Sequence, residues 1–215
     1  MSLKVNEIFF SIQGESSFAG RPCAFIRLTG CNLRCAYCDT QYAYEAGTRL
    51  EIPAILEQIG DYRCRLVEIT GGEPLLQGDT PELIRALLDR EFTVLLETNG
   101  SRDIGITDER CIRILDIKCP SSGESEKNHL ENLRILTVRD EIKFVIGNRE
   151  DYEYAKFILS TYLPQRDHLK PPLLSPVFNR MDTEMLARWI LEDRLDVRLQ
   201  LQLHKLIWGP EQRGV

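Results

Sequence analysis

Three cysteines, Cys31, Cys35 and Cys38, lie close together at the spacing C-x3-C-x2-C. Thiolates are soft ligands that suit zinc, copper(I) and iron–sulfur clusters, so this density of cysteines indicates a metal site. A structural zinc site takes four protein ligands, whereas the next cysteine, Cys64, stands alone. Three thiolates on a four-iron cluster would instead leave one iron open for another ligand. The alternative, a buried segment with unlinked cysteines, is disfavoured because the residues between and after them are polar.

This loop resembles the cluster loop of the radical S-adenosylmethionine (SAM) superfamily. Asp39 and Thr40 follow the last cysteine, and the residue before that cysteine is the aromatic Tyr37. In that superfamily the cysteines bind three irons of a 4Fe–4S cluster, and the open iron takes the amino and carboxylate groups of SAM. The resemblance implies that Cys31, Cys35 and Cys38 hold such a cluster. It also implies that the cofactor carries the radical chemistry, so we expect no side chain to act as the catalyst.

A second motif, Gly71-Gly72-Glu73-Pro74, resembles the superfamily segment that binds the amino group of SAM. Two glycines allow backbone carbonyls to approach an ammonium group closely, and Glu73 can add or relay negative charge. A tight turn before a helix is the alternative. The motif is weak evidence alone, but together with the cysteine loop it indicates a cofactor site.

Composition places the chain among globular proteins. Its 215 residues, with 43% hydrophobic and 28% charged, fit a single domain, so we expect residues 1–215 to form one radical SAM domain. No apolar run approaches a membrane span and no signal-peptide pattern opens the chain, which predicts a cytoplasmic protein without a membrane partner. The seven cysteines do not pair by spacing, which argues against a disulfide framework. A net charge of −6 without a basic stripe disfavours a nucleic-acid partner.

Strands and helices alternate along the predicted structure. Hydrophobic patterning predicts strands at residues 22–29, 66–70, 93–97, 112–118, 141–146, 173–177 and, with strict alternation, 197–204. Helices are expected at residues 51–60, where Gly60 ends the helix, and at residues 130–136, 150–162 and 182–192. A further helix is expected to begin at Thr80, which would be its N-cap. The last two helices are expected to bury, respectively, Tyr154, Phe157, Ile158 and Tyr162, and Met185, Leu186, Trp189 and Ile190.

This alternation predicts an α/β fold, with a parallel sheet covered by helices. About six strand–helix units are too few for a full barrel of roughly 250 residues, so we expect a partial, open TIM-like barrel. Ligands of such folds bind at the carboxyl ends of the strands. The expected strand ends carry the cysteine loop, residues 70–73, residues 98–99, Lys118 and residues 175–176.

Arg27 interrupts an otherwise apolar strand. A buried cation must reach water or an acceptor, and a structural ion pair and a ligand contact are both open for it. The polar residues 13–15 after the first apolar segment form either a surface turn or part of a site. Of the histidines, His129 and His168 are expected to be solvated, and His204 to reach substrate, a subunit interface or an ordinary hydrogen-bond partner. Cys119 is expected near the site, with no second cysteine or other ligand residue to pair with it.

These features together resemble the 7-carboxy-7-deazaguanine synthase family over essentially the whole chain. The resemblance rests on residues 12–15, Arg27, the C-x3-C-x2-C-D-T loop and the terminal segment 204–211. That family converts 6-carboxy-5,6,7,8-tetrahydropterin to 7-carboxy-7-deazaguanine, with ring contraction and loss of ammonia, for biosynthesis of queuosine and other 7-deazapurines. The resemblance implies Mg²⁺ as a further cofactor, a reductant such as flavodoxin or ferredoxin, and a homodimer.

The resemblance also assigns roles to positions of this sequence. Contacts to the pterin are implied for Ile12, Gln13, Gly14, Arg27 and Thr70. Contacts to SAM are implied for Tyr37, Cys38, Asp39 and Gly72, and further cofactor contacts for Asp116, Ile117, Lys118, Ser175 and Pro176. Thr40 is the implied Mg²⁺ ligand, with substrate oxygens and waters completing the octahedron. An arginine such as Arg27 suits the pterin carboxylate because it can bind it through two hydrogen bonds.

Two other classes of function remain open from the sequence. A glycyl-radical activating enzyme would use the same cluster chemistry on a protein, but Arg27 and residues 13–15 favour a small-molecule pocket. An iron–sulfur electron carrier or a zinc-stabilised binding module would not be an enzyme. It would lack the expected fourth ligand and leave the Gly-Gly-Glu-Pro turn unexplained.

Overall fold

A nine-stranded sheet forms the frame of the computed structural model, which describes residues 1–164 and 169–215. The strand order is β3-β1-β2-β4-β5-β6-β7-β8-β9. The strands are β1 Ser2–Ile12, β2 Pro22–Leu28, β3 Thr48–Glu51, β4 Leu66–Gly71, β5 Thr93–Thr98, β6 Ile112–Ile117, β7 Glu141–Ile146, β8 Leu173–Pro176 and β9 Arg198–Leu199. From β2 through β4 to β9 the ladder is parallel, whereas β1 pairs antiparallel with both β2 and β3.

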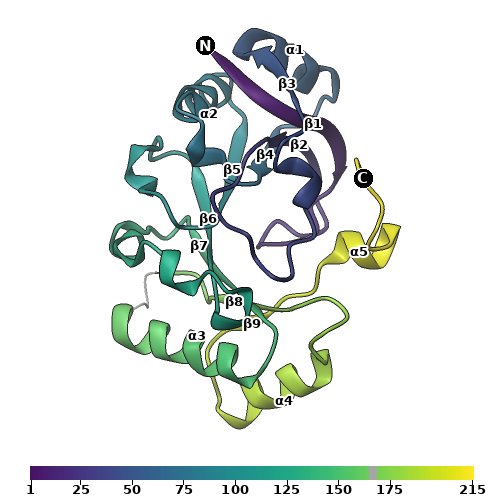
Figure 1. The fold of residues 1–215 in the computed structure, drawn as a ribbon. Helices are drawn as coiled ribbons and strands as arrows, with labels where there is room; N and C mark the ends of the chain where they lie inside the picture. Colours follow the sequence, from purple (N-terminus) through teal and green to yellow (C-terminus); the bar gives the residue numbers. More distant parts are fainter. Residues whose placement is uncertain (165–168) are drawn as a thin grey trace.

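The sheet is open, with β3 and β9 at its edges, and it curves so that helices cover its outside (Figure 1). This arrangement confirms the predicted α/β fold with a partial barrel. The helices are α1 Ile52–Asp61, α2 Thr80–Leu88, α3 Arg149–Tyr162, α4 Thr183–Glu192 and α5 Leu203–Trp208. The first four lie along the outer face of the sheet, and α5 lies on the opposite side (Figure 1).

Helix boundaries differ from prediction in ways that local chemistry explains. Helix α1 runs through Gly60 to Asp61, because Gly60 keeps a helical conformation instead of the left-handed one that ends a helix. Asp79 precedes α2, and Thr80 is already its first residue, with its hydroxyl donating to the Pro74 carbonyl. The segment Leu130–Ile135 is a 3-10 helix.

The buried faces of α3 and α4 were only partly predicted. Phe157 is 57% exposed and Met185 is 46% exposed. The buried face of α3 contains Tyr152 and Ala155 in addition to the predicted Ile158. The face that meets the sheet is therefore rotated relative to the one that the aromatic residues suggested.

Both ends of the chain depart from prediction. The first apolar segment is a full antiparallel strand, β1. The predicted strand over residues 197–204 is wrong, since β9 is limited to Arg198–Leu199 and α5 begins at Leu203. Leu199 and Leu201 are 38% and 39% exposed, so the alternating leucines have no core to face.

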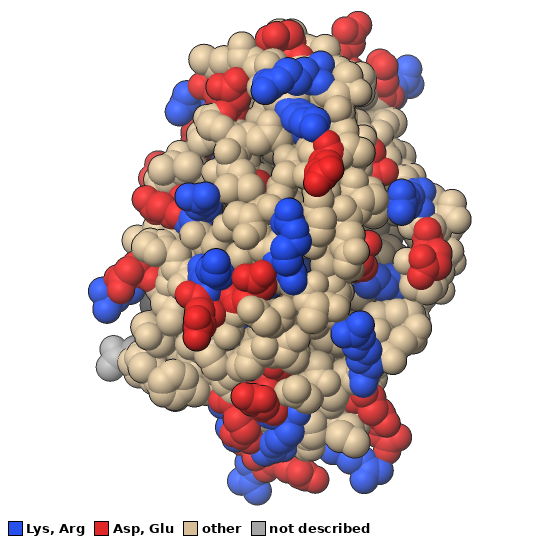
Figure 2. All heavy atoms as spheres, viewed as in Figure 1, with Lys and Arg blue, Asp and Glu red and all other residues tan. Residues whose placement is uncertain are grey.

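The charged surface residues match the mixed composition. Figure 2 shows Lys and Arg interspersed with Asp and Glu on the face viewed. Within the described ranges, no helix has the length and apolar character needed to cross a bilayer. His168 falls outside those ranges.

Candidate active site

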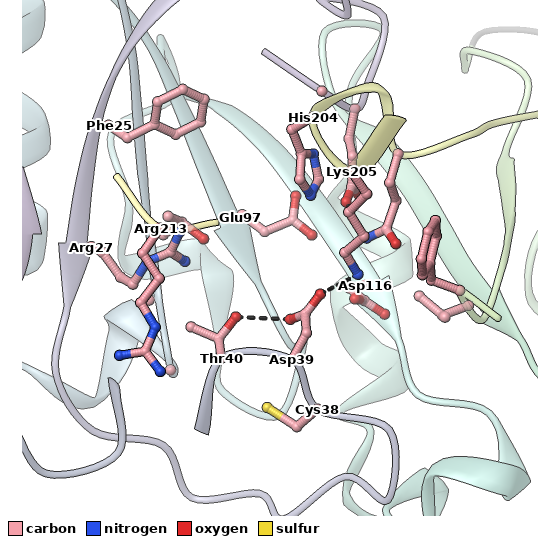
Figure 3. Close-up of a pocket in the computed structure, with 18 of the residues that line it drawn as sticks. Phe25, Arg27, Cys38, Asp39, Thr40, Glu97, Asp116, His204, Lys205 and Arg213 are labelled. Atoms are coloured by element: carbon pink, nitrogen blue, oxygen red, sulfur yellow. Dashed lines mark hydrogen bonds and ion pairs between the residues drawn. The ribbon is translucent and has the colours of Figure 1, made fainter. Parts of the chain in front are cut away.

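A cavity of about 320 Å³ opens at the carboxyl ends of the parallel strands. Its walls are the cysteine loop (residues 30–40), the loop after β1, polar residues of the central strands, and the C-terminal segment from Gln202 (Figure 3). The predicted strand ends thus meet around one space, as the parallel topology requires, except at residues 175–176, which do not line it.

The cysteine loop supplies three free thiols, Cys31, Cys35 and Cys38, to this cavity. Burial raises the pKa of Cys35 to about 11 and also raises that of Cys31, so bound metal would be needed to hold them as thiolates. The Cys31 sulfur accepts hydrogen bonds from the Leu33 N–H at 3.4 Å and the Asn99 side chain at 3.8 Å. These donors and the soft ligand set fit an iron–sulfur cluster.

A single metal ion is a poorer fit to these thiols. Nowhere in residues 1–164 and 169–215 do three His, Cys, Asp or Glu side chains converge on one ion position. The ligands of a four-iron cluster need not converge in this way, because each thiolate binds a different iron.

The glycine turn after β4 lies directly against the cysteine loop. A Cβ at Gly72 would lie 2.1 Å from the Gly30 carbonyl oxygen and 2.7 Å from the Cys31 Cβ. Gly71 has a φ of +147°, and a Cβ there would lie 2.2 Å from the Leu28 carbonyl oxygen. Gly72 is thus required by contact with the loop that carries the thiols and Gly71 by contact with the end of β2, and both glycines line the cavity.

Glu73 does not line the cavity, so it can add negative charge there only through the groups that it holds. It is fully buried, and its carboxylate accepts hydrogen bonds from the Thr98 hydroxyl at 2.9 Å and the Asn99 N–H at 2.7 Å. It also accepts one from the Leu75 N–H at 3.0 Å. Glu73 therefore fixes the end of β5 against the glycine turn.

Asp116 presents an unused acceptor to the cavity. Its Oδ2 accepts from the Lys118 Nζ at 2.9 Å, whereas its Oδ1 is buried without a hydrogen-bond partner among residues 1–164 and 169–215. Such an atom calls for a donor from a ligand, and the hydroxyl and ammonium groups of SAM offer donors of this kind. Ile117 and Cys119 are buried in the core and do not line the cavity.

The loop after β1 is held by its own side chains. Gln13 is buried, with its Nε2 donating to Glu68 and its Oε1 accepting from the Glu15 N–H at 3.1 Å. These two hydrogen bonds use one donor and one acceptor of the amide and hold the loop in place. A Cβ at Gly14 would lie 2.1 Å from the Nδ1 of His204, so only glycine lets α5 pack here.

Arg27 points into the cavity but is already paired. Its Nε donates to the Glu7 carboxylate at 2.7 Å, and the Tyr42 hydroxyl donates to the same oxygen at 3.1 Å. Its guanidinium carbon also lies 5.7 Å from the centre of the Tyr42 ring. The structure thus shows an ion pair at Arg27 within the cavity wall.

A group of buried charges at the base of the cavity escaped the sequence reasoning. Lys143 Nζ donates to Glu15 at 2.8 Å and to Glu97, and it lies 3.6 Å from the Asp116 carboxylate. Burial raises the pKa of Glu15, but Lys143 and His204 outweigh it and hold that pKa at about 2. Glu97 behaves oppositely, because burial and the neighbouring carboxylates raise its pKa to about 8 despite Lys143.

The same reasoning that singled out Arg27 could have found these residues. Glu68, Glu97 and Lys143 each interrupt an apolar strand, as Arg27 does. Burial and, to a lesser extent, the charge of Glu15 raise the pKa of Glu68 to about 7. Charged residues at inward positions of successive strands were the available signal.

The end of the cysteine loop is tied to α5. Asp39 accepts hydrogen bonds from the Thr40 hydroxyl at 2.8 Å and from the Lys205 Nζ at 2.5 Å (Figure 3). Burial raises the pKa of Asp39, but Lys205 and Thr40 outweigh it and bring that pKa to about 2. The Thr40 hydroxyl oxygen keeps lone pairs for a further partner.

Most residues with a predicted role line this one cavity. They are Ile12, Gln13, Gly14, Arg27, Cys31, Cys35, Tyr37, Cys38, Asp39, Thr40, Thr70, Gly72, Asp116 and Lys118. Ile117, Ser175 and Pro176 do not, and at β8 the lining comes from Val177 and Phe178 instead. Glu15, within the polar segment 13–15 that the sequence marked as a possible part of a site, also lines it, and sequence reasoning missed Glu68, Glu97, Lys143, Lys205 and residues 209–215.

Comparisons with known proteins agree on one family. The Radical SAM superfamily profile matches residues 25–156. The 7-carboxy-7-deazaguanine synthase of Chlorobaculum tepidum is 47% identical, over 99% of this chain and 97% of its own. That of Koribacter versatilis is 42% identical, over 99% of this chain and all of its own. The crystal structure of QueE from Escherichia coli superposes with a TM-score of 0.77 at 26% identity, covering 94% of each chain.

Proposed function

Because the chain belongs to the radical SAM superfamily and, within it, to the 7-carboxy-7-deazaguanine synthases, we propose that it converts 6-carboxy-5,6,7,8-tetrahydropterin to 7-carboxy-7-deazaguanine. The reaction contracts the pterin ring with loss of ammonia and serves 7-deazapurine biosynthesis. The observation that carries the proposal is the meeting of the three thiols, the glycine turn and the charged loop after β1 around one cavity.

The family uses a 4Fe–4S cluster and SAM, which together supply abstraction of a hydrogen atom from the substrate by a carbon radical. In this chain Cys31, Cys35 and Cys38 would hold the cluster. Tyr37, Asp39 and Gly72 lie beside them and would bind SAM, with the free Asp116 Oδ1 as an acceptor for one of its donors. We also assign Ile117, Lys118, Ser175 and Pro176 to the cofactor side, although Ile117, Ser175 and Pro176 would act only by shaping the backbone.

The pterin would lie between the loop after β1 and the strand ends. Ile12, Gly14 and Thr70 line this part, and Gln13 holds the loop in place through Glu68. The protonated Glu97 beside the ionised Glu15 gives the cavity base both a proton donor and a proton acceptor near Lys143. Such a pair suits a reaction that must protonate a leaving amine.

Thr40 is our proposed Mg²⁺ ligand. Its hydroxyl oxygen lines the cavity beside Asp39, and a single protein oxygen suffices where substrate oxygens and waters complete the coordination.

The remaining partners follow from surface and composition. We propose a homodimer, which the exposed apolar residues Leu206, Ile207 and Trp208 on α5 support. We further propose one domain over residues 1–215, which the continuous sheet supports, in a cytoplasmic protein reduced by a flavodoxin or ferredoxin. Neither a nucleic acid nor a membrane is a proposed partner.

An anaerobic assay tests the function directly. Reconstituted protein is supplied with the carboxytetrahydropterin, SAM, Mg²⁺ and a reductant, and the deazaguanine product is measured by mass spectrometry. We expect 7-carboxy-7-deazaguanine and an equal amount of ammonia, both dependent on the substrate, SAM and the reductant. Cluster-replete protein that forms no 7-carboxy-7-deazaguanine would contradict the proposal.

A further inference from the structure

Asn99, directly after β5, connects the two motifs of the site. It is buried, with 6% exposure, and it lines the cavity. Its backbone N–H donates to the Glu73 carboxylate at 2.7 Å, and its side-chain Nδ2 donates to the Cys31 sulfur at 3.8 Å. Glu73 belongs to the glycine turn and Cys31 to the cysteine loop, so one residue joins the buried carboxylate to a cluster ligand.

Three side chains form a closed ring of hydrogen bonds that holds the Asn99 amide. Asn32 Nδ2 donates to Ser101 Oγ at 2.9 Å, and Ser101 Oγ donates to Asn99 Oδ1 at 2.6 Å. Asn99 Nδ2 closes the ring by donating to Asn32 Oδ1 at 3.3 Å. The amide is therefore held at both its oxygen and its nitrogen, and its second N–H is left for Cys31.

The Ser101 backbone decides which end of the amide faces the sulfur. The Ser101 N–H donates to Asn99 Oδ1 at 3.0 Å, and a backbone N–H can act only as a donor. An inverted amide would bring Nδ2 against this N–H and the carbonyl oxygen against the Cys31 sulfur, so both hydrogen bonds would be lost. The network thus presents an N–H group to Cys31.

An N–H group at a ligating sulfur affects how easily a cluster is reduced. One electron from the reductant adds one negative charge, which spreads over the irons and sulfurs, and no bond to Asn99 forms or breaks. A hydrogen bond strengthens as the charge on its acceptor grows, so the donor stabilises the reduced state more than the oxidised one. Hydrogen bonds to the sulfurs accordingly help to set the potential of such clusters, and this one should raise it.

We propose that Asn99 is a positioning residue that raises the reduction potential of the 4Fe–4S cluster by donating to the Cys31 thiolate. Glu73 holds the backbone of Asn99, and Asn32 and Ser101 hold its amide. The proposal rests on the cluster assignment within the proposed function and not on the identity of the pterin. It also gives a role to Glu73, whose carboxylate lies outside the cavity wall.

The test measures the reduction potential without SAM or substrate. Wild type, Asn99→Leu and Asn99→Ala are reconstituted anaerobically and their iron content is determined. Each is then titrated with titanium(III) citrate in the presence of redox mediators, and the reduced cluster is followed by electron paramagnetic resonance. Both substitutions remove the side-chain N–H and keep the backbone N–H that Glu73 accepts. Alanine adds no bulk, so it serves as the second variant if leucine prevents folding.

Asn132→Leu is the matched control. Asn132 is 1% exposed, and its Nδ2 donates to the Gly100 carbonyl at 3.1 Å and to the Arg102 carbonyl at 2.7 Å. It thus holds the same loop after β5, but it does not line the cavity. A change of potential caused by loosening of this loop would therefore appear in the control as well.

We expect Asn99→Leu and Asn99→Ala to lower the equilibrium constant for reduction about three- to tenfold, which is about 30 to 59 mV for a one-electron couple. Their iron content should match that of the wild type, because Asn99 is not an iron ligand. Asn132→Leu should lose stability in thermal unfolding but keep the potential of the wild type.

The outcomes separate this inference from the proposed function. An unchanged or higher potential in iron-replete Asn99 variants would overturn the inference, and so would an equal fall in Asn132→Leu. Loss of the cluster from both Asn99 variants would also overturn it, because Asn99 would then be needed for assembly. If the potential falls as expected while the wild type forms no deazaguanine, the proposed function fails and the inference stands. If the wild type makes product and the potentials are equal, the inference alone fails.

Discussion

Lys143 meets more negative charge than it can neutralise. It contacts Glu15, Glu97 and Asp116 at the base of the cavity, and Lys118 also pairs with Asp116. Like charges in a site of low polarity cannot all ionise, so the carboxyls separate into ionised and protonated forms. Glu15 takes the first role and Glu97 the second, which places an acid and a base side by side where the proposed reaction needs both.

Glu97→Gln should make the stability of the metal-free protein less dependent on pH. The pKa of Glu97 is about 8 in the folded protein against an ordinary value of 4.5, so the folded state holds this proton more tightly between those values. Its contribution to stability is complete below about pH 4.5 and is lost as the pH rises through 8. Glutamine removes this titration and keeps an acceptor for Lys143.

The effect is measured by urea unfolding of both proteins between about pH 5 and about pH 8, the range over which the difference between the folded and unfolded pKa changes the free energy of unfolding. We expect the free energy of unfolding to fall with pH in the wild type and to fall less in Glu97→Gln, with some slope left from Glu68. The exposed Glu57→Gln on α1 is the control and should follow the wild type. Identical slopes in all three proteins would show that Glu97 is ionised throughout.

Cys35→Ala should fold but lose the cluster. Cys35 is only partly buried, and within the described residues its thiol makes no hydrogen bond, while its carbonyl accepts from the Cys38 N–H and would be kept in alanine, so the substitution removes a ligand and little packing. After anaerobic reconstitution we expect the broad visible absorption of a 4Fe–4S cluster to be lost or reshaped and turnover to fall to background, with an unchanged far-ultraviolet circular dichroism spectrum. Cys64→Ala, which lies away from the cavity, should keep both cluster and turnover. An active Cys35→Ala protein would exclude Cys35 as an iron ligand.

At the scale of elements, the glycine turn and the cysteine loop behave as one unit. The Glu73 N–H donates to the Gly30 carbonyl at 2.7 Å, and the Gly72 N–H donates to the Leu28 carbonyl at 3.3 Å. The turn after β4 is therefore fastened to the chain just before Cys31. This contact explains on physical grounds why the two motifs occur together.

Gly72→Ala should disturb the thiols without touching them chemically. The new Cβ would meet the Gly30 carbonyl at 2.1 Å, a backbone contact that cannot be relieved by rotating a side chain. We expect a loss of stability of about 1–3 kcal/mol and less iron bound per chain after reconstitution, measured by thermal unfolding and by iron analysis.

The matched control is Gly78→Ala. Nothing lies within 4 Å of a Cβ built at Gly78, so this variant should bind as much iron as the wild type. A Gly72→Ala protein with normal iron content and normal stability would mean that the turn moves freely relative to the cysteine loop.

Elements with a buried face could be predicted, and elements without one could not. Strands such as β4 and β5 have apolar sequences that only a core explains, and their carboxyl ends correctly located Thr70 and Asn99 at the cavity. The segment 197–204 has the alternation of a strand, but its leucines face no layer, and it becomes the short β9 and α5. The local sequence pattern cannot reveal whether such a segment forms a strand, because the outcome depends on whether the rest of the fold provides a surface for its leucines to pack against.

The same limit applied to the site. The cysteines and glycines were recognised by spacing, since their chemistry is local in sequence. Glu15, Lys143 and Arg213 come together from distant parts of the chain, and nothing near each of them in sequence indicates its partners. The inward direction of alternate strand residues would have supplied the missing signal for Lys143 but not for Arg213, which lies in an irregular segment.

At the scale of the whole molecule, the open sheet is joined across its gap. The loop after β1 reaches the chain that follows β9: the Ser16 N–H donates to Gln200 Oε1 at 2.9 Å, and the Leu203 N–H donates to the Gly14 carbonyl at 3.0 Å. The Gln202 amide also donates to Glu15 at 2.7 Å. These contacts link the amino-terminal hairpin to α5 and thereby fix residues 13–15, one wall of the cavity.

Gln200→Ala should loosen this link from a position outside the cavity. Gln200 is buried, and its loss leaves the Ser16 N–H without an acceptor, at a cost of about 1–3 kcal/mol for an unsatisfied buried donor. Hydrogen exchange should therefore quicken at residues 13–20 and in α5, while the central strands β4 to β6 keep their protection. Because the loop carries part of the pterin wall, the KM for the substrate should rise more than kcat falls.

Gln58→Ala on the exposed face of α1 provides the comparison and should leave exchange unchanged in both regions. Faster exchange spread evenly over the whole sheet would indicate global destabilisation instead of a local link. Faster exchange confined to residues 13–20 and α5 would establish that Gln200 links the loop after β1 to α5. The cavity wall would then depend on contacts between the first and last parts of the chain.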